Sequence, residues 1–298
     1  MRCISSGCAG CEAPPVNHSV QIGALHYYPI KSAAGIELER ALLTPAGFED
    51  DRRWMLVTDA GRFITQREAP RLALLRPRLS ANALLLTAPE LPEIPIALSR
   101  RGPRRTVTVW QDACEAYDEG DEAAAWLYAF LGVACRLVRF DPAQRRLSER
   151  AWTGAIEAEN RFSDGFPLLM LSAASLGELN GRLAVPLPVN RFRPNLVLEG
   201  LQPYDEDRID ELYGSEADGN EVRLKLVKPC TRCRITVTNQ DTGELEGDEP
   251  LRTLRSYRYD ARLHGVCFGQ NAIVAQGAGT ALTRGQSLQI RWREHQER

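Results

Sequence analysis

Short alternating runs of apolar and polar residues dominate this chain. They are bounded by Gly, Pro, Asn or Asp, which is typical of β-strands joined by turns. In the first half the runs occupy residues 20–32, 53–58, 62–65, 81–87, 105–110 and 135–140. In the second half they occupy residues 168–171, 196–198, 222–227, 269–276 and 288–292. The pattern predicts a protein built mainly from short strands.

Two stretches instead show the spacing of an amphipathic helix. In residues 121–131 and again in residues 173–183, the apolar positions fall on one side of a helix. Ser172 precedes the second stretch and is a favoured N-terminal cap. Residues 36–44 fit either a strand or a short helix, and the Pro-rich interval 89–103 predicts a loop with an edge strand. The fold class expected is therefore β-rich α+β.

A polar, aperiodic interval separates two β-rich halves and predicts a linker or an active-site lid. The expected division is an N-terminal tail at residues 1–19, a β-barrel-like domain at residues 20–140, the linker or lid at residues 141–160, and a second β-barrel domain with a few helices at residues 161–294.

Composition narrows the range of functions. The chain has 298 residues, is 44% hydrophobic and 26% charged, and carries a formal net charge of −2. Mixed charges predict no nucleic-acid and no membrane partner. No apolar run approaches the ~20 residues that span a bilayer, and residues 1–19 lack the apolar centre of a signal peptide. Eight scattered cysteines favour a reducing cytoplasm over a disulfide framework.

The most informative motif is the cysteine pair Cys230 and Cys233. Pro229 and the alternating run 234–238 predict that the pair sits on a loop leading into a strand. The spacing alone leaves four possibilities: half of a zinc site, a dithiol redox pair, two inert buried thiols, or one thiolate that binds a soft transition metal in a cofactor. Lys228, Arg232 and Arg234 supply positive charge that would favour a thiolate.

A second group of cysteines lies near the N-terminus. Cys3, Cys8 and Cys11 have the C-x4-C-x2-C spacing with which plant-type ferredoxin sites begin. The next cysteine is Cys114, so a fourth ligand at moderate distance is missing. We expect a tail with incidental thiols rather than an iron–sulfur site.

Several ordered motifs now identify a family. They are Y-P-I-K-S at residues 28–32, D-R-R-W at 51–54, N-R-F-R-P-N at 190–195, K-P-C-T-R-C at 228–233, T-G-E at 242–244 and F-G-Q-N at 268–271. Together they closely resemble MOSC-domain proteins of the YcbX and mitochondrial amidoxime-reducing component branch. The resemblance runs from about residue 20 to residue 293. It implies a MOSC barrel preceded by the N-terminal MOSC-associated domain, and it implies molybdenum cofactor and an association with pyridoxal phosphate binding.

The resemblance also assigns candidate site residues. Cys233 would be the metal ligand and the catalytic residue, whereas Cys230 would be structural. The cofactor contacts would be Lys31, Ser32, Arg52, Asp164, Gly165, Arg193, Asn195, Gln270 and Asn271. Lys, Arg and Ser suit a phosphate, and Asn or Gln can donate to and accept from a pterin. The departure at Gly165 and Phe166 leaves only backbone donors at residues 164–165. Each residue also has a plainer interpretation: a solvated Lys31, an Arg52 paired with Asp50 or Asp51, a loop cap at residues 193–195, and core hydrogen bonds for Gln270.

By resemblance, the activity would be reduction of N-hydroxylated compounds such as amidoximes, with molybdenum removing an oxygen atom. The chain ends at Arg298 without a fused iron–sulfur domain, so we expect a separate ferredoxin or flavin reductase as the electron donor. One alternative is a protein that transfers sulfur to the cofactor, or carries the cofactor, through a cysteine persulfide. Another is a zinc-stapled β-protein without pterin.

Overall fold

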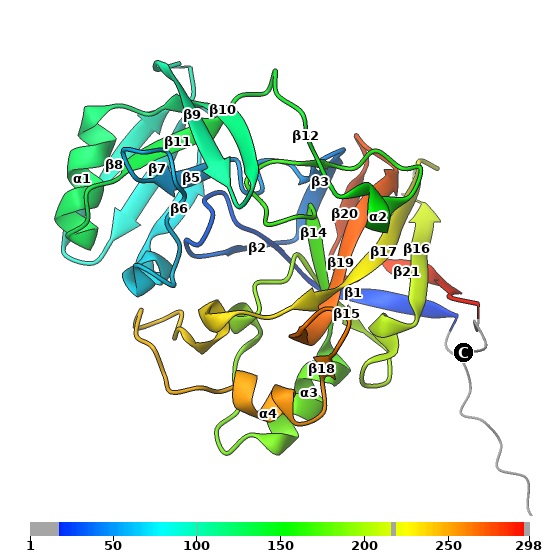
Figure 1. Cartoon of the computed structure of the whole chain (residues 1–298). Helices are drawn as coiled ribbons and strands as arrows, with labels where there is room; N and C mark the ends of the chain where they lie inside the picture. Colours follow the sequence, from blue (N-terminus) through cyan, green and yellow to red (C-terminus); the bar gives the residue numbers. More distant parts are fainter. Residues whose placement is uncertain (1–17, 100, 216–218, 295–298) are drawn as a thin grey trace, which may run out of the picture.

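The structure is a computed structural model, and it describes residues 18–99, 101–215 and 219–294 (Figure 1). Seven strands form a closed barrel, which β14 and β19 close by pairing with each other. In ring order the strands are β14 (Leu168–Ser172), β15 (Leu196–Glu199), β1 (Ser19–Tyr27), β21 (Ser287–Trp292), β16 (Ile209–Ser215), β17 (Glu221–Thr231) and β19 (Gly265–Gln276). Only the pair β14–β15 in this ring is parallel. The predicted β-rich α+β fold is confirmed.

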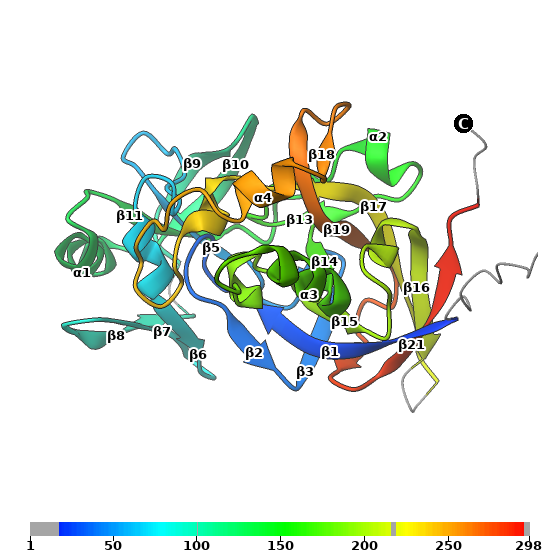
Figure 2. The same cartoon turned by 90° about the horizontal axis from the view of Figure 1, so that it is seen from below.

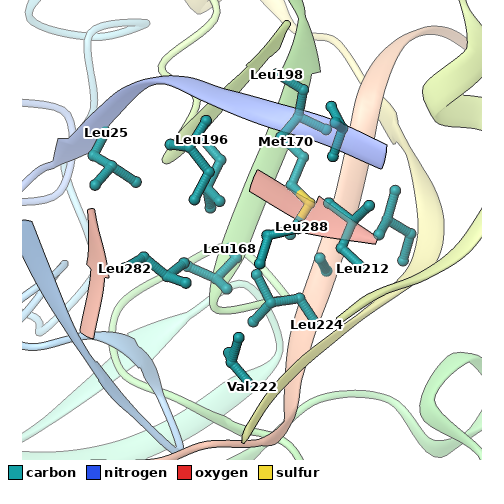
Figure 3. Close-up of a cluster of buried hydrophobic side chains, with 14 of the residues drawn as sticks. Leu25, Leu168, Met170, Leu196, Leu198, Leu212, Val222, Leu224, Leu282 and Leu288 are labelled. Carbon is teal, nitrogen blue, oxygen red and sulfur yellow. The ribbon is translucent and has the colours of Figure 1, made fainter. Parts of the chain in front are cut away.

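Apolar side chains fill the interior of this barrel. Successive residues of a strand point to opposite faces, so alternate residues of each strand turn inward. On β1 the inward residues are Val20, Ile22 and, after a shift of register between Ile22 and Ala24, Leu25, and all three are buried. Figure 3 shows the cluster they join, which includes Leu168, Met170, Leu196, Leu198, Leu212, Val222, Leu224, Leu282 and Leu288. The barrel interior is therefore a packed core and not a ligand chamber.

The N-terminal half forms a second layer of sheets beside the barrel (Figures 1 and 2). A four-stranded antiparallel sheet has the order β5 (Trp54–Val57), β11 (Arg136–Phe140), β10 (Asp112–Asp118) and β9 (Arg104–Val109). A three-stranded sheet has the order β6 (Arg76–Leu79), β7 (Ala83–Ala88) and β8 (Leu91–Ala97). Helix α1 (Asp121–Leu131) contacts β8 and β11 and buries Leu127 and Phe130 between them.

The two halves of the sequence are interleaved in space. Strand β1 comes from the N-terminal half, yet it pairs with β15 and β21 inside the barrel. A small sheet joins β20 (Ala281–Thr283) to β3 (Arg40–Thr44) and β4 (Gly47–Phe48). Two short strands extend the barrel sheet, β2 (Ile36–Leu38) beside β1 and β18 (Tyr259–Asp260) beside β19. Loops from both halves therefore meet at one edge of the molecule.

Short elements give structure to the interval predicted as a linker or lid. It contains β12 (Arg146–Leu147), α2 (Arg150–Thr153) and β13 (Glu159–Asn160), and β12 pairs with β13. Helix α3 (Ala173–Arg182) begins after Ser172, whose hydroxyl accepts from the backbone N–H of Ala174, as predicted. Helix α4 is Leu251–Arg255. None of the helices in the described ranges combines the length and hydrophobicity needed to cross a bilayer.

Some local predictions were wrong. The run predicted as a strand after Cys233 is a 3₁₀ turn, η4 (Arg234–Val237), in which the N–H and hydroxyl of Thr236 both donate to the Cys233 carbonyl at 3.2 and 3.0 Å. Four alternating residues fit a turn as well as a strand when no neighbouring strand pairs with them. Residues 62–65 contribute two isolated bridges, Phe63 to Val57 and Arg62 to Thr108, instead of a full hairpin partner. The strands that were not predicted are β4, β6, β10, β12, β13, β16, β18 and β20.

Candidate functional site

A pocket of ≈ 450 Å³ lies where loops of both halves meet. It collects every predicted site residue except one: Lys31, Ser32, Arg52, Asp164, Gly165, Arg193, Asn195, Cys233 and Asn271. They come from the loop after β1, the turn before β5, the segment between β13 and β14, the approach to β15, the region after β17, and β19. Residues far apart in sequence thus share one cavity.

Gln270 does not line this pocket. Its side chain is fully buried, and Nε2 donates to Asp207 Oδ1 at 2.7 Å. Asn271 is its neighbour on β19 and does line the pocket, as expected when successive residues of a strand face opposite sides. Predicting Gln270 as a pocket residue was therefore wrong, and core hydrogen bonding is its role.

The two cysteines of the motif differ in their surroundings. Cys230 lies near the end of β17, and Arg232 holds it by donating from Nη1 to Cys230 Sγ at 2.9 Å and from Nη2 to the Phe192 carbonyl at 2.6 Å. Cys233 is exposed in the pocket, and its sulfur has no hydrogen-bond partner among the described residues. The structure thus leaves the Cys233 thiol available to a ligand, a difference that the spacing could not reveal.

Zinc and iron–sulfur alternatives depend on further ligands. In the part of the chain that the structure describes, no three His, Cys, Asp or Glu side chains gather to hold a metal ion. A structural zinc site needs about four such ligands, so the cysteine pair does not complete one there. Cys3, Cys8 and Cys11 lie outside the described residues.

Arg52 and Arg193 converge on Tyr28. Their guanidinium carbons lie 4.2 and 4.3 Å from the centroid of its ring, and the Tyr28 hydroxyl donates to the Pro194 carbonyl at 3.0 Å. Arg52 also forms an ion pair with Asp51 and donates to Asn195 Oδ1 at 3.0 Å. The cation–π contacts and the ion pair fix both forks at the pocket wall.

One guanidinium nitrogen of Arg193 is buried and unpaired. Its Nη1 donates to the Ala33 carbonyl at 2.5 Å, but Nη2 has no hydrogen-bond partner among the described residues. Burial lowers the pKa of Arg193 to about 10, an effect that Tyr28 opposes and Arg52 reinforces. A buried guanidinium with an unpaired donor is costly. Because Arg193 lines the pocket, an anionic group that reached Nη2 from there would satisfy it.

Asn195 has a supporting role. Its Oδ1 accepts from Arg52 and from the Leu169 N–H at 3.1 Å, and its Nδ2 donates to the His26 carbonyl at 3.1 Å. The amide is thus engaged by the protein itself. It positions Arg52 and ties the start of β15 to β14 and β1.

Lys31 and Asp164 form an ion pair in the pocket wall. The buried Lys31 Nζ donates to Asp164 Oδ1 at 2.5 Å and to the Phe162 carbonyl at 2.8 Å. The indole N–H of Trp110, which is 52% exposed, donates to the same Asp164 oxygen at 3.0 Å. Desolvation opposes ionisation, but Lys31 and Trp110 outweigh it and hold the pKa of Asp164 well below its usual value. The Asp164 side chain is thus engaged, although only backbone donors were expected there.

Three of the site residues have left-handed backbone conformations. The φ angles are +66° at Ser32, +47° at Arg52 and +55° at Arg193. Non-glycine residues rarely adopt this region, and such strain gathers at functional sites when surrounding bonds enforce it. At Ser32 the enforcing bond comes from Gln66, whose Nε2 donates to the Ser32 carbonyl at 2.7 Å.

Several pocket residues were missed or only partly foreseen. Lys228 and Arg232 line the pocket, whereas Arg234, the third predicted source of positive charge, does not. Arg67 lies over the Trp110 ring at 4.8 Å, and neither was predicted. Only the fold reveals them, because no local motif marks a residue that reaches a pocket from another sheet.

The pocket is strongly basic. Its lining contains six basic residues and one acidic residue, Asp164. The basic residues are Lys31, Arg52, Arg67, Arg193, Lys228 and Arg232. Such an excess selects an anionic ligand. The available Cys233 thiol adds a soft donor for a metal. These features fit a phosphorylated pterin that carries molybdenum.

Comparison with known proteins agrees with this geometry. Residues 19–134 match the family described as MOSC N-terminal beta barrel domain, and residues 157–289 match the MOSC domain. The chain is similar to proteins named mitochondrial amidoxime-reducing component 1. The Mus musculus protein is 34% identical, over 86% of this chain and 76% of that protein. The Homo sapiens protein is 32% identical, over 86% and 77%. A component 2 from Bos taurus is 33% identical, over 80% and 72%.

Proposed function

Because this chain belongs to the family of MOSC-domain proteins that contains the amidoxime-reducing components, we propose that it binds molybdenum cofactor and reduces N-hydroxylated compounds. The observation that carries the proposal is a pocket with an available thiol at Cys233 and an unpaired buried donor at Arg193. The thiol would ligate the metal, and the buried donor would pair with the anionic part of the cofactor.

Different residues of the pocket would bind different parts of the cofactor. Lys31, Arg52 and Arg193 would hold the anionic end of the cofactor, since all three are fixed by bonds on the protein side. Cys233 would ligate the metal. Arg232 engages Cys230, which leaves one thiol of the pair uncommitted. Gly165 and Asn271 would contact the pterin from the pocket wall.

The reaction proposed is the reduction of a C=N–OH group. It breaks the N–O bond, consumes two electrons and two protons, and releases water and the parent nitrogen compound. The bound molybdenum centre would supply the oxygen-atom transfer, and the protein would supply ligation and orientation. We propose that the electrons come from a separate ferredoxin or flavin reductase. The cytoplasmic location stays a prediction.

The test uses protein made in a host that synthesises the cofactor. We expect stoichiometric molybdenum, a fluorescent pterin after oxidation, and turnover of benzamidoxime with a chemical reductant. Cys233→Ser should lose the metal and the turnover together, and the matched variant Cys230→Ser should keep a substantial part of both, because Cys230 is held by Arg232. A persulfide on Cys233 without turnover would favour the sulfur-transfer alternative. Loss of metal in Cys230→Ser alone would overturn the assignment of the ligand.

A further inference from the structure

Lys228 lies in the pocket wall on the side of the cysteine pair. It belongs to β17, two residues before Cys230, and its Cα pairs in register with that of Asn271 on β19. All three residues line the same pocket as Cys233. Lys228 therefore belongs to the part of the pocket where a substrate would meet the metal.

Aromatic rings hold the Lys228 ammonium group. Its Nζ lies 4.7 Å from the centroid of the Trp152 ring and 6.0 Å from that of Phe166. Trp152 belongs to α2, which packs against β17 (Figures 1 and 2). Cation–π contacts orient an ammonium group while leaving its charge and its N–H donors available. Within residues 18–99, 101–215 and 219–294, Nζ has neither a hydrogen-bond acceptor nor a carboxylate partner.

This availability distinguishes Lys228 from two other cations of the pocket, Lys31 and Arg232. Lys31 is paired with Asp164 and bonded to the Phe162 carbonyl. Arg232 donates from Nη1 to Cys230 Sγ and from Nη2 to the Phe192 carbonyl. Lys228 lines the pocket and has no such bond, so the N–H donors of its Nζ have no protein acceptor among the described residues.

Building on the proposed function, we propose that Lys228 binds an anionic substituent of the substrate and makes the enzyme selective for planar N-hydroxylated compounds that carry a carboxylate. The rings of Trp152 and Phe166 hold the ammonium group in place, and Phe166, which lines the pocket, would lie beside the planar body of such a compound. A carboxylate would accept a charge-assisted hydrogen bond from Nζ. The neutral isostere of that substrate would lack the charge and leave Nζ without a strong acceptor.

The test compares 4-carboxybenzamidoxime with its neutral counterpart 4-carbamoylbenzamidoxime. Both are reduced by the cofactor-loaded enzyme with a chemical reductant, and the measured quantity is the ratio of their kcat/KM values. In Lys228→Met, the kcat/KM for the carboxylate divided by that for the neutral compound should fall about tenfold. In Lys228→Arg this ratio should recover most of its wild-type value. Lys225→Met is the matched control on the same strand, because Lys225 lies outside the pocket near Asp210, at 3.8 Å, and this variant should keep the wild-type ratio.

A second readout does not depend on turnover. Calorimetric titration with 4-carbamoylbenzoate and with terephthalamide, neither of which can be reduced, should show that the wild type prefers the anion and that Lys228→Met does not. The inference would be overturned if Lys228→Met kept the wild-type kcat/KM ratio and the wild-type protein bound both ligands equally well. Loss of molybdenum and pterin from Lys228→Met would also overturn it, by making Lys228 a cofactor contact. Failure of the loaded wild type to reduce either amidoxime would instead refute the proposed function, and the titration would still test the anion site.

Discussion

Arg193→Met should separate cofactor binding from folding. Arg193 is buried, and it bonds the Ala33 carbonyl, stacks on Tyr28 and leaves Nη2 unpaired. If it serves the fold, its loss should destabilise the protein. If it serves a ligand, its loss should cost little stability and much affinity. The two roles thus predict opposite results in two measurements.

The magnitudes follow from the structure. Burial lowers the pKa of Arg193 from 12.5 to about 10, and at ~1.4 kcal/mol per pKa unit this shift means that the folded state holds the charged form at a cost of about 3 kcal/mol. The neutral Met removes that cost but forfeits a charged hydrogen bond of about 1.5–3 kcal/mol and a cation–π contact of about 0.5–2 kcal/mol. We expect the stability of the cofactor-free variant to lie within about 1–2 kcal/mol of the wild type. Without the Arg193 donor, the cofactor should bind about 10–100-fold more weakly.

The assay measures urea unfolding of cofactor-free protein and molybdenum content of protein made in a cofactor-competent host. Arg191→Met is the matched control: Arg191 is buried two residues away, pairs with Glu246 and does not line the pocket. This control should keep its metal content per folded molecule. A large loss of stability in Arg193→Met, together with full metal content, would refute the reasoning.

Three further predictions concern the frame of the site. Glu206 is buried, and burial raises its pKa to about 7. The folded state therefore favours the protonated acid. About 3 kcal/mol of stability should be present below pH ~4.5 and be lost as the pH rises through ~7. Glu206→Gln should flatten this slope in thermal melts from pH 5 to 8, and an unchanged slope would count against it. Gln66→Leu should cost about 2–3 kcal/mol in urea unfolding, because it leaves the Gln240 Oε1 and the Ser32 carbonyl without their donor; a neutral result would show that this link does not hold the Ser32 backbone. Leu224→Ala should cost about 2–5 kcal/mol as a cavity in the barrel core, without changing metal content per folded molecule.

Amphipathic spacing and a capping residue were enough to predict the two longest helices. Helix α1 has the predicted bounds, and α3 begins at its predicted Ser172 cap. Alternation found six of the seven barrel strands and missed β16, and it failed after Cys233, where four residues form a 3₁₀ turn. Strand pairing was beyond reach, because the placement of β1 between β15 and β21 depends on contacts across more than a hundred residues.

The site shows the same limit. Sequence motifs brought Lys31, Arg52 and Arg193 to attention, and the fold places them in one pocket. The motifs could not assign individual amides, so Gln270 was taken for a pocket residue although its strand turns it toward Asp207. Arg67 was missed because no sequence motif marks it. Its place in the pocket beside Trp110 is set by tertiary structure.

The most direct test of the central claim is anomalous diffraction at the molybdenum edge from crystals of the loaded protein. The account predicts an anomalous peak beside Cys233 Sγ, with the density of the anionic end of the cofactor against Lys31, Arg52 and Arg193. A peak bound to Cys230, or cofactor density away from those three side chains, would contradict it.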